Sequence, residues 1–525
     1  MQLPKTFHFG EDHLTASIAL GIADGSIEAA VTDHCFEKIK ASSLRVQNIV
    51  AKGDTVYGIN TGFGPLCNTK ISKEDTRILQ SNILQSHSVG VGQPITQKLS
   101  KLMLILKIQA LSKGFSGIAV ATIQRMLWHL DNNAIPIVPS QGSVGASGDL
   151  APLSHLFLPL IGLGKVDYEG KTITTDELFK KTGLKPLELG PKEGLALING
   201  TQFIAAHAVL VVQKLQYALR HADIIGAMML EGLQGSMKPF HEKLHEVRPF
   251  KGNQHVAGRI RTLLQGSEIL EDHIDCERVQ DPYSLRCIPQ VHGASRNAWL
   301  HLKELLEVEL NAVTDNPVII DDELTISGGN FHGQPLAMAL DYAALAASEL
   351  GNISDRRVYL ALEGNSPGVP KLLMEDTGIN SGYMILQYTS AALASENKSL
   401  CFPASADSIP TSLGQEDHVS MGSISGRKAL NIIENVEKIL AIELLTAAQA
   451  FEYRKPLKSG VLLDEIHKFV RTKVSFAESD RVFADDIEQG IQMIQEGEII
   501  ALVEHVMDSK KLKWNTPHQH EFEMY

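Results

Sequence analysis

Apolar residues recur at helical spacing along most of the first part of the chain. This pattern predicts helices over residues 73–87, 98–111 and 120–130, and short amphipathic helices within residues 11–52. Residues 166–173 turn at Glu169-Gly170, which predicts a small hairpin. Residues 55–64 form a brief extended piece that leads into a glycine-rich loop, the kind of segment in which functional groups often lie. We therefore expect this part of the chain to be rich in loops.

Longer and more strongly apolar segments follow Asn199. They cover residues 204–233, 336–362 and 428–453. Each is more apolar than a surface helix needs to be, and a helix that is apolar on most sides is buried within a bundle. Shorter amphipathic helices are expected over 462–505, and a hairpin over 318–327. The predicted fold class is mainly α, with a loop-rich region in residues 1–199, a long-helix bundle core in residues 200–525 and a few short hairpins.

Composition narrows the class of protein without giving a function. The 525 residues are 44% hydrophobic, which is ordinary for a globular protein with a sizeable core, and they carry a net charge of −13. An acidic chain argues against a nucleic-acid partner, and no apolar run approaches the roughly 18 residues that span a bilayer. The amino terminus lacks the apolar core of a signal peptide, and the five scattered cysteines fit reduced thiols. We expect a cytoplasmic protein with neither a membrane nor a nucleic-acid partner.

One stretch, residues 142–155, has the composition needed for a backbone reaction. The amide nitrogen of Gly148 can attack the carbonyl carbon of Ala146 and close a five-membered ring through Ser147. Loss of two waters, one of them carrying the Ser147 hydroxyl, leaves a methylidene-imidazolone, an electrophile that no standard side chain supplies. Small residues are required because the chain must fold back within three residues.

These residues alone leave a simpler alternative open. A glycine-rich loop can cap a helix that starts near Leu150, with Ser147 or Asp149 as the N-cap residue. A phosphate-binding loop is a poorer fit, because the glycines are spaced three apart and no lysine follows them.

The full run from Gly142 to His155 resembles the signature of the histidine and aromatic amino-acid ammonia-lyases, whose cofactor is made from Ala-Ser-Gly. Five other stretches match the same pattern, and together they cover most of the chain. The resemblance implies the fumarase/aspartase-like fold of long helices. It implies a methylidene-imidazolone formed autocatalytically from Ala146, Ser147 and Gly148, with no metal or nucleotide. It also implies a homotetramer whose sites are composed from several subunits.

The first two matching stretches supply a tyrosine and a histidine. Tyr57 occupies the position of the family's proposed base, which removes the β-proton of the substrate; by itself, a tyrosine in a short extended piece is usually a packing residue. Phenol has a pKa of about 10, so this role requires surroundings that stabilise phenolate. His87 occupies the family's substrate-selectivity position. A Ser-His pair there resembles the histidine-specific members, whereas the phenylalanine enzymes carry apolar side chains.

Further matching stretches supply residues for the rest of the substrate. By resemblance, Asn199 holds the substrate carboxylate and the cofactor carbonyl, although Asn before Gly is also typical of a turn. Arg286 is suited to a bidentate clamp on an α-carboxylate. The resemblance implies that Gln280 and Tyr283 line the pocket and that Phe331 lies beside the cofactor ring.

The last stretch contains Glu416 at a position where the phenylalanine and tyrosine lyases carry Gln. A carboxylate pairs with an imidazole N–H or with its cationic form more strongly than an amide does. His87 and Glu416 thus indicate the same substrate, and we expect elimination of ammonia from L-histidine to give trans-urocanate, the first step of histidine degradation. The alternatives are a phenylalanine or tyrosine ammonia-lyase or a 2,3-aminomutase of the same family, or a catalytically silent scaffolding homologue.

Two positions depart from the family's pattern. His292 stands where a less polar residue is expected, and Gln334 stands where many relatives carry an acid. Neither position has a direct role by resemblance, so both are expected to affect only the surroundings of the site. The tail pair His518 and His520 lacks a third ligand, and we expect no metal there.

Overall fold

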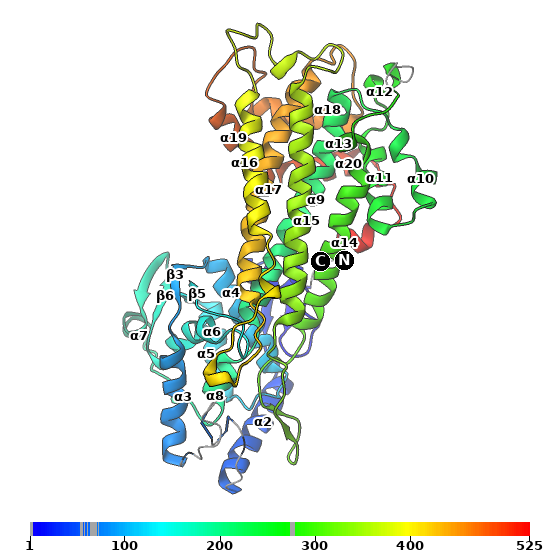
Figure 1. The fold of residues 1–525 in the computed structure, drawn as a ribbon. Coiled ribbons are helices and arrows are strands. Elements are labelled where there is room, and N and C mark those ends of the chain that lie inside the picture. The colour runs from blue at the N-terminus through cyan, green and yellow to red at the C-terminus, as the bar shows by residue number, and fades with distance from the viewer. Residues whose placement is uncertain are drawn as a thin grey trace. The chain divides into compact units, whose positions relative to one another are not determined.

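The computed structural model describes residues 4–52, 56, 58–59, 61–62, 71, 73–273 and 279–525 (Figure 1). Helices dominate these residues and the strands are short, which confirms the predicted mainly α class. The chain divides into two compact units, each built from segments that are not contiguous in sequence. The first unit contains the residues up to 210, 302–341 and 403–427, and the second contains 211–301, 342–402 and 428–525. The predicted division of the sequence at Asn199 stays a prediction.

The first unit is built around a nearly inaccessible helix. Its helices are α1 (Ala16–Asp24), α2 (Asp33–Lys52), α3 (Lys73–His87), α4 (Gln97–Ser112), α5 (Val120–Asp131), α6 (Leu150–Phe157), α7 (Thr175–Thr182) and α8 (Glu193–Ile198). Helix α4 packs against α1 and α5, and Leu102, Met103 and Ile105 on it are buried. The observed bounds of α3, α4 and α5 confirm the three helices predicted in this region.

The strands of the first unit form small sheets. They are β1 (Thr6–His8), β2 (Glu28–Ala30), β3 (Val91–Pro94), β4 (Ile135–Pro136), β5 (Pro139–Gln141), β6 (Lys165–Tyr168), β7 (Lys171–Thr174), β8 (Val318–Ile319) and β9 (Thr325–Ile326). Strands β6 and β7 form the hairpin predicted at Glu169-Gly170, and β4 adds to it in the antiparallel order β4-β6-β7. The β8–β9 hairpin was also predicted, whereas the parallel β1–β2 pair and the antiparallel β3–β5 pair were not.

Four long helices of the described chain have residues in both units. They are α9 (Gln202–Gly232), α14 (Ile288–Leu310), α15 (Gln334–Leu362) and α17 (Gly422–Glu452). Three of them confirm the predicted long apolar segments. Helix α17 begins six residues before its predicted start. Helix α14 was not predicted, because polar residues such as His292 and Arg296 interrupt its apolar pattern and are buried nonetheless.

The second unit contains further shorter helices. They are α10 (Glu242–Glu246), α11 (Lys251–Leu263), α12 (Glu268–Asp272), α13 (Tyr283–Arg286), α16 (Met384–Leu400), α18 (Val461–Lys473), α19 (Phe483–Gln495), α20 (Glu498–Lys510) and α21 (Gln519–Phe522). The predicted apolar stripe of α17, which includes Val436, Ile439 and Leu444, is fully buried. The described residues include no helix with both the length and the apolar character needed to cross a membrane.

The unexpected His292 belongs to a buried charge network of the second unit. One of its ring nitrogens lies 3.0 Å from Asp223 Oδ1, and Arg259 Nε donates to the other oxygen of that carboxylate at 2.9 Å. Arg296 also pairs with Asp223. A buried carboxylate is stable only when it is paired and hydrogen-bonded. His292 is one of the hydrogen-bonding partners of Asp223, which explains why a histidine is tolerated on the inner face of α14.

Candidate active site

The loop before α6 folds back sharply at the Ala146-Ser147-Gly148 turn. The φ angle of Ser147 is 51° and that of Gly148 is 81°, both in the left-handed region. This region is uncommon for a residue with a side chain, so Ser147 is held there by its surroundings. A Cβ atom on Gly148 would lie 2.1 Å from Gly200 O, so only glycine fits at this position.

Residues around the start of α17 hold the first half of this loop. Met421 N donates to Val144 O at 2.9 Å, and Ser423 Oγ donates to Ser143 O at 2.6 Å. Gly145 packs so closely on Ser420 that a Cβ atom would lie 2.1 Å from the serine Oγ. The loop is therefore fixed by a segment almost 280 residues away in sequence.

Asn199 and Gly200, which link α8 to α9, hold the second half. Asn199 Nδ2 donates to Ser147 O at 2.8 Å, and Gly200 N donates to the same oxygen at 3.4 Å. Asp149 N in turn donates to Gly200 O at 2.7 Å. The structure thus brings Asn199 to the carbonyl of Ser147. The other side-chain atom, Asn199 Oδ1, is buried and has no hydrogen-bond partner among the described residues.

Asp149 has a different role from the helix cap that its position suggests. It precedes α6, yet its side chain makes no capping hydrogen bond to that helix. Asp149 Oδ2 instead accepts from Phe203 N at 3.1 Å and from Ile204 N at 3.0 Å, in the first turn of α9. Burial raises the pKa of this carboxyl group to about 7, while these hydrogen bonds act in the opposite direction. Asp149 therefore ties the loop that contains the Ala146-Ser147-Gly148 turn to the start of α9.

Glu416 contacts the serine of the turn directly. Ser147 Oγ donates to Glu416 Oε1 at 2.5 Å. The other carboxylate oxygen accepts from Ser412 Oγ at 2.7 Å and from Thr411 Oγ1 at 3.1 Å. The carboxylate is thus anchored on one side and presented to Ser147 on the other.

His87, at the end of α3, lies close enough to Glu416 for the charge of the carboxylate to act on its ring. Burial lowers the pKa of His87, and the negative charge of Glu416 acts against this effect. A ring nitrogen of His87 lies 3.0 Å from Oγ of the preceding residue, Ser86. The first unit therefore brings together Ser147, Asn199, Glu416 and His87.

The structure adds little about two other predicted site residues, Tyr57 and Phe331. Tyr57 lies outside the described residues. Phe331 is half-buried in the segment that precedes α15, where His332 N donates to Gly329 O at 2.9 Å. The second departure, Gln334, opens α15 and donates through Nε2 to Ser405 O at 3.3 Å, a contact for which an acid would lack the proton when ionised.

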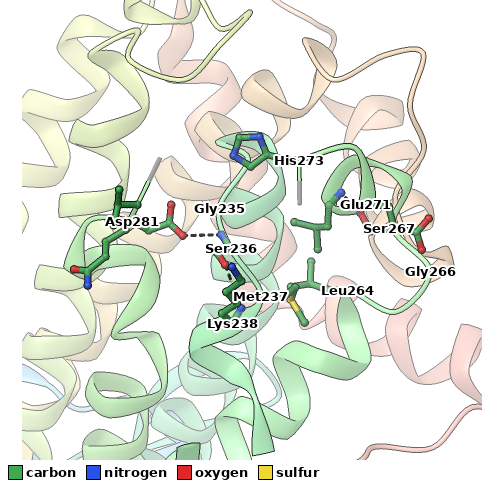
Figure 2. A pocket seen from close by; sticks show the side chains of 13 residues that line it. Gly235, Ser236, Met237, Lys238, Leu264, Gly266, Ser267, Glu271, His273 and Asp281 are labelled. Carbon is green, nitrogen blue, oxygen red and sulfur yellow. Dashed lines mark hydrogen bonds between the residues drawn. The ribbon is translucent and has the colours of Figure 1, made fainter. Parts of the chain in front are cut away.

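Gln280, Tyr283 and Arg286 belong to the second unit. Arg286 Nε donates to Asp281 O at 2.9 Å, and its guanidinium carbon lies 4.5 Å from the centre of the Tyr283 ring. Tyr283 is 71% exposed, so this stacked pair is presented at a surface. Gln280 lines a cavity of about 310 Å³, in which Asp281 accepts from Ser236 N at 2.6 Å (Figure 2).

The sequence pattern missed one polar residue beside the site, Lys107. It lies on α4, is 1% exposed, and donates through Nζ to Asn199 O at 2.6 Å. The available signal was a lysine within an otherwise apolar helix. No group of metal-ligating side chains occurs among the described residues, and His518 contacts Gln254 and Glu521.

Comparison with known proteins identifies the family. The chain matches the aromatic amino acid lyase family over residues 14–472. It is 48% identical over 489 residues to histidine ammonia-lyase from Sorangium cellulosum, covering 91% of this chain and 95% of that protein. The crystal structure of histidine ammonia-lyase from Trypanosoma cruzi matches with a TM-score of 0.89 and 38% identity, over 98% of this chain and 97% of that one. Tyrosine aminomutase from Streptomyces globisporus matches with a TM-score of 0.89 and 33% identity, over 95% and 98%. The chain therefore belongs to the aromatic amino acid lyase family.

Proposed function

We propose that this chain is a histidine ammonia-lyase, which eliminates ammonia from L-histidine and releases trans-urocanate. The observation that carries the proposal is the arrangement of Ser147, Glu416 and His87. Glu416 contacts the serine of the Ala-Ser-Gly turn, and its charge acts on His87. An imidazole substrate placed there can form hydrogen bonds to the Glu416 carboxylate and to a ring nitrogen of His87. These partners satisfy the polar atoms of the imidazole ring. The relatives that carry this name support the same substrate.

The Ala146-Ser147-Gly148 turn fits the formation of a methylidene-imidazolone. Its backbone is already folded back, and the close approach of Gly200 leaves no room for a side chain on the attacking residue, Gly148. Asn199 Nδ2 and Gly200 N both point at Ser147 O, the oxygen that becomes the ring carbonyl. Once formed, the ring supplies an electrophilic methylene carbon.

The remaining roles follow from the chemistry of each side chain. Tyr57 removes the β-proton, and Glu416 with His87 orients the imidazole ring. Arg286 clamps the α-carboxylate together with Asn199, because a planar guanidinium forms two parallel hydrogen bonds to a carboxylate. Gln280, Tyr283 and Phe331 line the substrate pocket. Holding the substrate and the base in attack geometry provides much of the rate enhancement.

The proposed assembly is a homotetramer in which each site takes residues from several subunits. Large apolar side chains that are exposed in the single chain support it. Leu413 is 94% exposed, Ile379 is 91% exposed and Phe402 is 82% exposed. Exposed apolar surface of this kind marks protein interfaces. The exposed Tyr283 and the guanidinium stacked on it are then available to a neighbouring subunit. We place the enzyme in the cytoplasm.

Two measurements on the purified protein test this function. Its intact mass should be two waters lower than the sequence mass. The Ser147→Ala chain lacks the hydroxyl group that leaves as the second water and should not become two waters lighter. Incubation with histidine should produce urocanate, whereas phenylalanine and tyrosine should be poor substrates. A chain that is two waters lighter but converts phenylalanine or tyrosine instead of histidine would have another activity of the family. A full-mass chain without any product would indicate a scaffolding protein.

A further inference from the structure

Lys107 is a buried cation whose hydrogen-bonding partners are neutral. Its Nζ donates to Asn199 O at 2.6 Å and lies 3.5 Å from Gln202 Oε1. Gln202 Nε2 in turn donates to Thr314 Oγ1 at 2.8 Å, which fixes the amide with its oxygen toward the lysine. Burying an ammonium group is costly unless a specific interaction uses its charge. The position of Lys107 therefore requires an explanation other than packing.

The nearest carboxylates do not provide one. Asp315 pairs with Lys192 Nζ at 2.7 Å and accepts from Ser116 Oγ at 2.7 Å. The Asp149 carboxylate accepts hydrogen bonds from backbone N–H groups in the first turn of α9. Both act on Lys107 through space, but its direct contacts are to the carbonyl oxygens of Asn199 and Gln202. The charge of Lys107 is thus directed at the link between α8 and α9.

The contacted carbonyl belongs to the peptide group that also carries the Gly200 N–H. Gly200 N is one of the two donors to Ser147 O, at 3.4 Å, and Asn199 Nδ2 is the other. A cation at one end of a peptide group polarises it and strengthens the donor at the other end. Lys107, the Asn199–Gly200 peptide and Ser147 O therefore form one continuous chain of polarised groups.

We propose that Lys107 is a positioning residue for cofactor formation, which acts through the Asn199–Gly200 peptide on the carbonyl oxygen of Ser147. The inference rests on the proposed function, because it assumes that the Ala146-Ser147-Gly148 turn cyclises. It concerns the second loss of water, after Gly148 N has attacked the Ala146 carbonyl carbon and that carbonyl oxygen has left as the first water.

The step that Lys107 assists is the dehydration of Ser147. The Cα proton of Ser147 passes to water, and its electron pair forms the Cα–Cβ double bond. The Cβ–Oγ bond breaks, and the hydroxyl group leaves and takes up a proton as water. Negative charge develops on Ser147 O while the Cα proton departs, because the two are joined through the carbonyl carbon. Donors fixed on that oxygen before the reaction stabilise this charge most effectively.

The titration of Lys107 is consistent with this role. Burial lowers its pKa to about 7, with the nearby charges of Asp315, Asp149 and Lys192 as smaller influences. The ammonium form, which polarises the peptide most strongly, is therefore lost as the pH rises above neutrality.

The test follows the mass of the chain after cell-free synthesis in wild type and in two variants. Lys107→Met removes charge and donor, and Lys107→Gln removes only the charge. Lys101→Met, on the same helix, is the matched control. Dehydration should slow by about tenfold or more in Lys107→Met, the effect of losing a hydrogen bond to a charged group, and by a smaller factor in Lys107→Gln, which keeps an uncharged donor. A species one water lighter than the sequence should accumulate, which a general folding defect would not produce.

The outcomes separate the two proposals. If the wild-type chain never loses mass, the proposed function fails and cyclisation does not occur. If the wild type becomes two waters lighter and both Lys107 variants do so at the same rate, the role of Lys107 is overturned. Variants that fold, as judged by circular dichroism, but stay at full mass also overturn it, because ring closure is then the affected step. Lys107→Gln keeps the test decisive if Lys107→Met does not fold.

Discussion

Glu416 Oε1 accepts a hydrogen bond of 2.5 Å from Ser147 Oγ, although 269 residues separate the two in sequence. The carboxylate is held from behind by Thr411 and Ser412, so its position is fixed without the serine. It serves two proposed purposes at one place. It faces the turn that forms the cofactor, and it provides the charge that recognises an imidazole ring.

Replacing Glu416 with glutamine should separate these purposes. The amide oxygen of Gln can still accept from Ser147 Oγ, so the chain should still lose two waters. An amide neither carries a charge nor exchanges a proton, and histidine turnover should fall by about 10²-fold or more, the usual size of an acid–base contribution. Intact mass and urocanate formation measure the two effects. Asp417→Asn, on the exposed neighbour, should leave both unchanged; equal turnover in Glu416→Gln would refute the role of the carboxylate.

His87→Phe should weaken recognition of histidine. Burial lowers the pKa of His87, so the ring is mostly neutral at pH 7 and offers one donor and one acceptor. Losing this partner leaves a polar group of the substrate unpaired, which costs about 1–3 kcal/mol, so kcat/KM for histidine should fall by roughly 10- to 100-fold. Activity toward phenylalanine should rise. His34→Phe on the exposed surface of α2 is the control, and an unchanged ratio of the two activities in His87→Phe would contradict the assignment.

Gly148→Ala should abolish cofactor formation through a steric clash. The new Cβ would lie 2.1 Å from Gly200 O, at a φ angle of 81°. Gly183→Ala is a matched control, because φ is 73° there and no atom lies within 4 Å of the added Cβ. The control should lose only about 1–2 kcal/mol of stability from left-handed backbone strain and should keep full activity. Thermal unfolding and intact mass distinguish the two variants. A Gly148→Ala chain that is two waters lighter than its sequence would show that the turn tolerates a side chain.

The long helices and the motif positions were predictable because both are local properties. Helical periodicity is written within each segment, as in the buried stripe of α17. The agreement between His87 and Glu416 came from two independent motifs that indicate one substrate. The sequence of a segment does not show which distant residue its polar side chains will contact. Asp149 looked like a cap for the helix that follows it, yet its carboxylate binds the start of α9.

Elements that depend on distant partners were missed for the same reason. Strand β1 has three residues and pairs with β2 in parallel, too short a run for alternation to be visible. Helix α14 was missed because its polar residues are neutralised by a network that only the folded chain assembles. Lys107 could be noticed in the sequence, but its partner, the Asn199 carbonyl, could not.

Asp149 should make stability depend on pH in a recognisable way. Its pKa is about 7 in the folded protein and near 4 when unfolded, so between these values the folded state binds the extra proton. The contribution of Asp149 to the free energy of unfolding therefore falls as the pH rises from about 4 to 7. Asp149→Asn cannot titrate and should lack this slope, which a series of thermal midpoints from pH 5 to pH 8 measures. Parallel profiles for the two proteins would contradict a buried, protonated Asp149.

Mixing two inactive variants tests whether sites are shared between subunits. Ser147→Ala lacks the electrophile, and Arg286→Ala lacks the carboxylate clamp; each alone should have little activity. If one subunit supplies Ser147 and another supplies Arg286, random co-assembly restores both residues to about a quarter of the sites. Co-expression of the two variants should therefore recover up to about that share of wild-type turnover. Co-expression of Ser147→Ala with the double variant should recover none, because no subunit then carries Ser147. Mixed oligomers that stay inactive would place both residues of each site on a single chain.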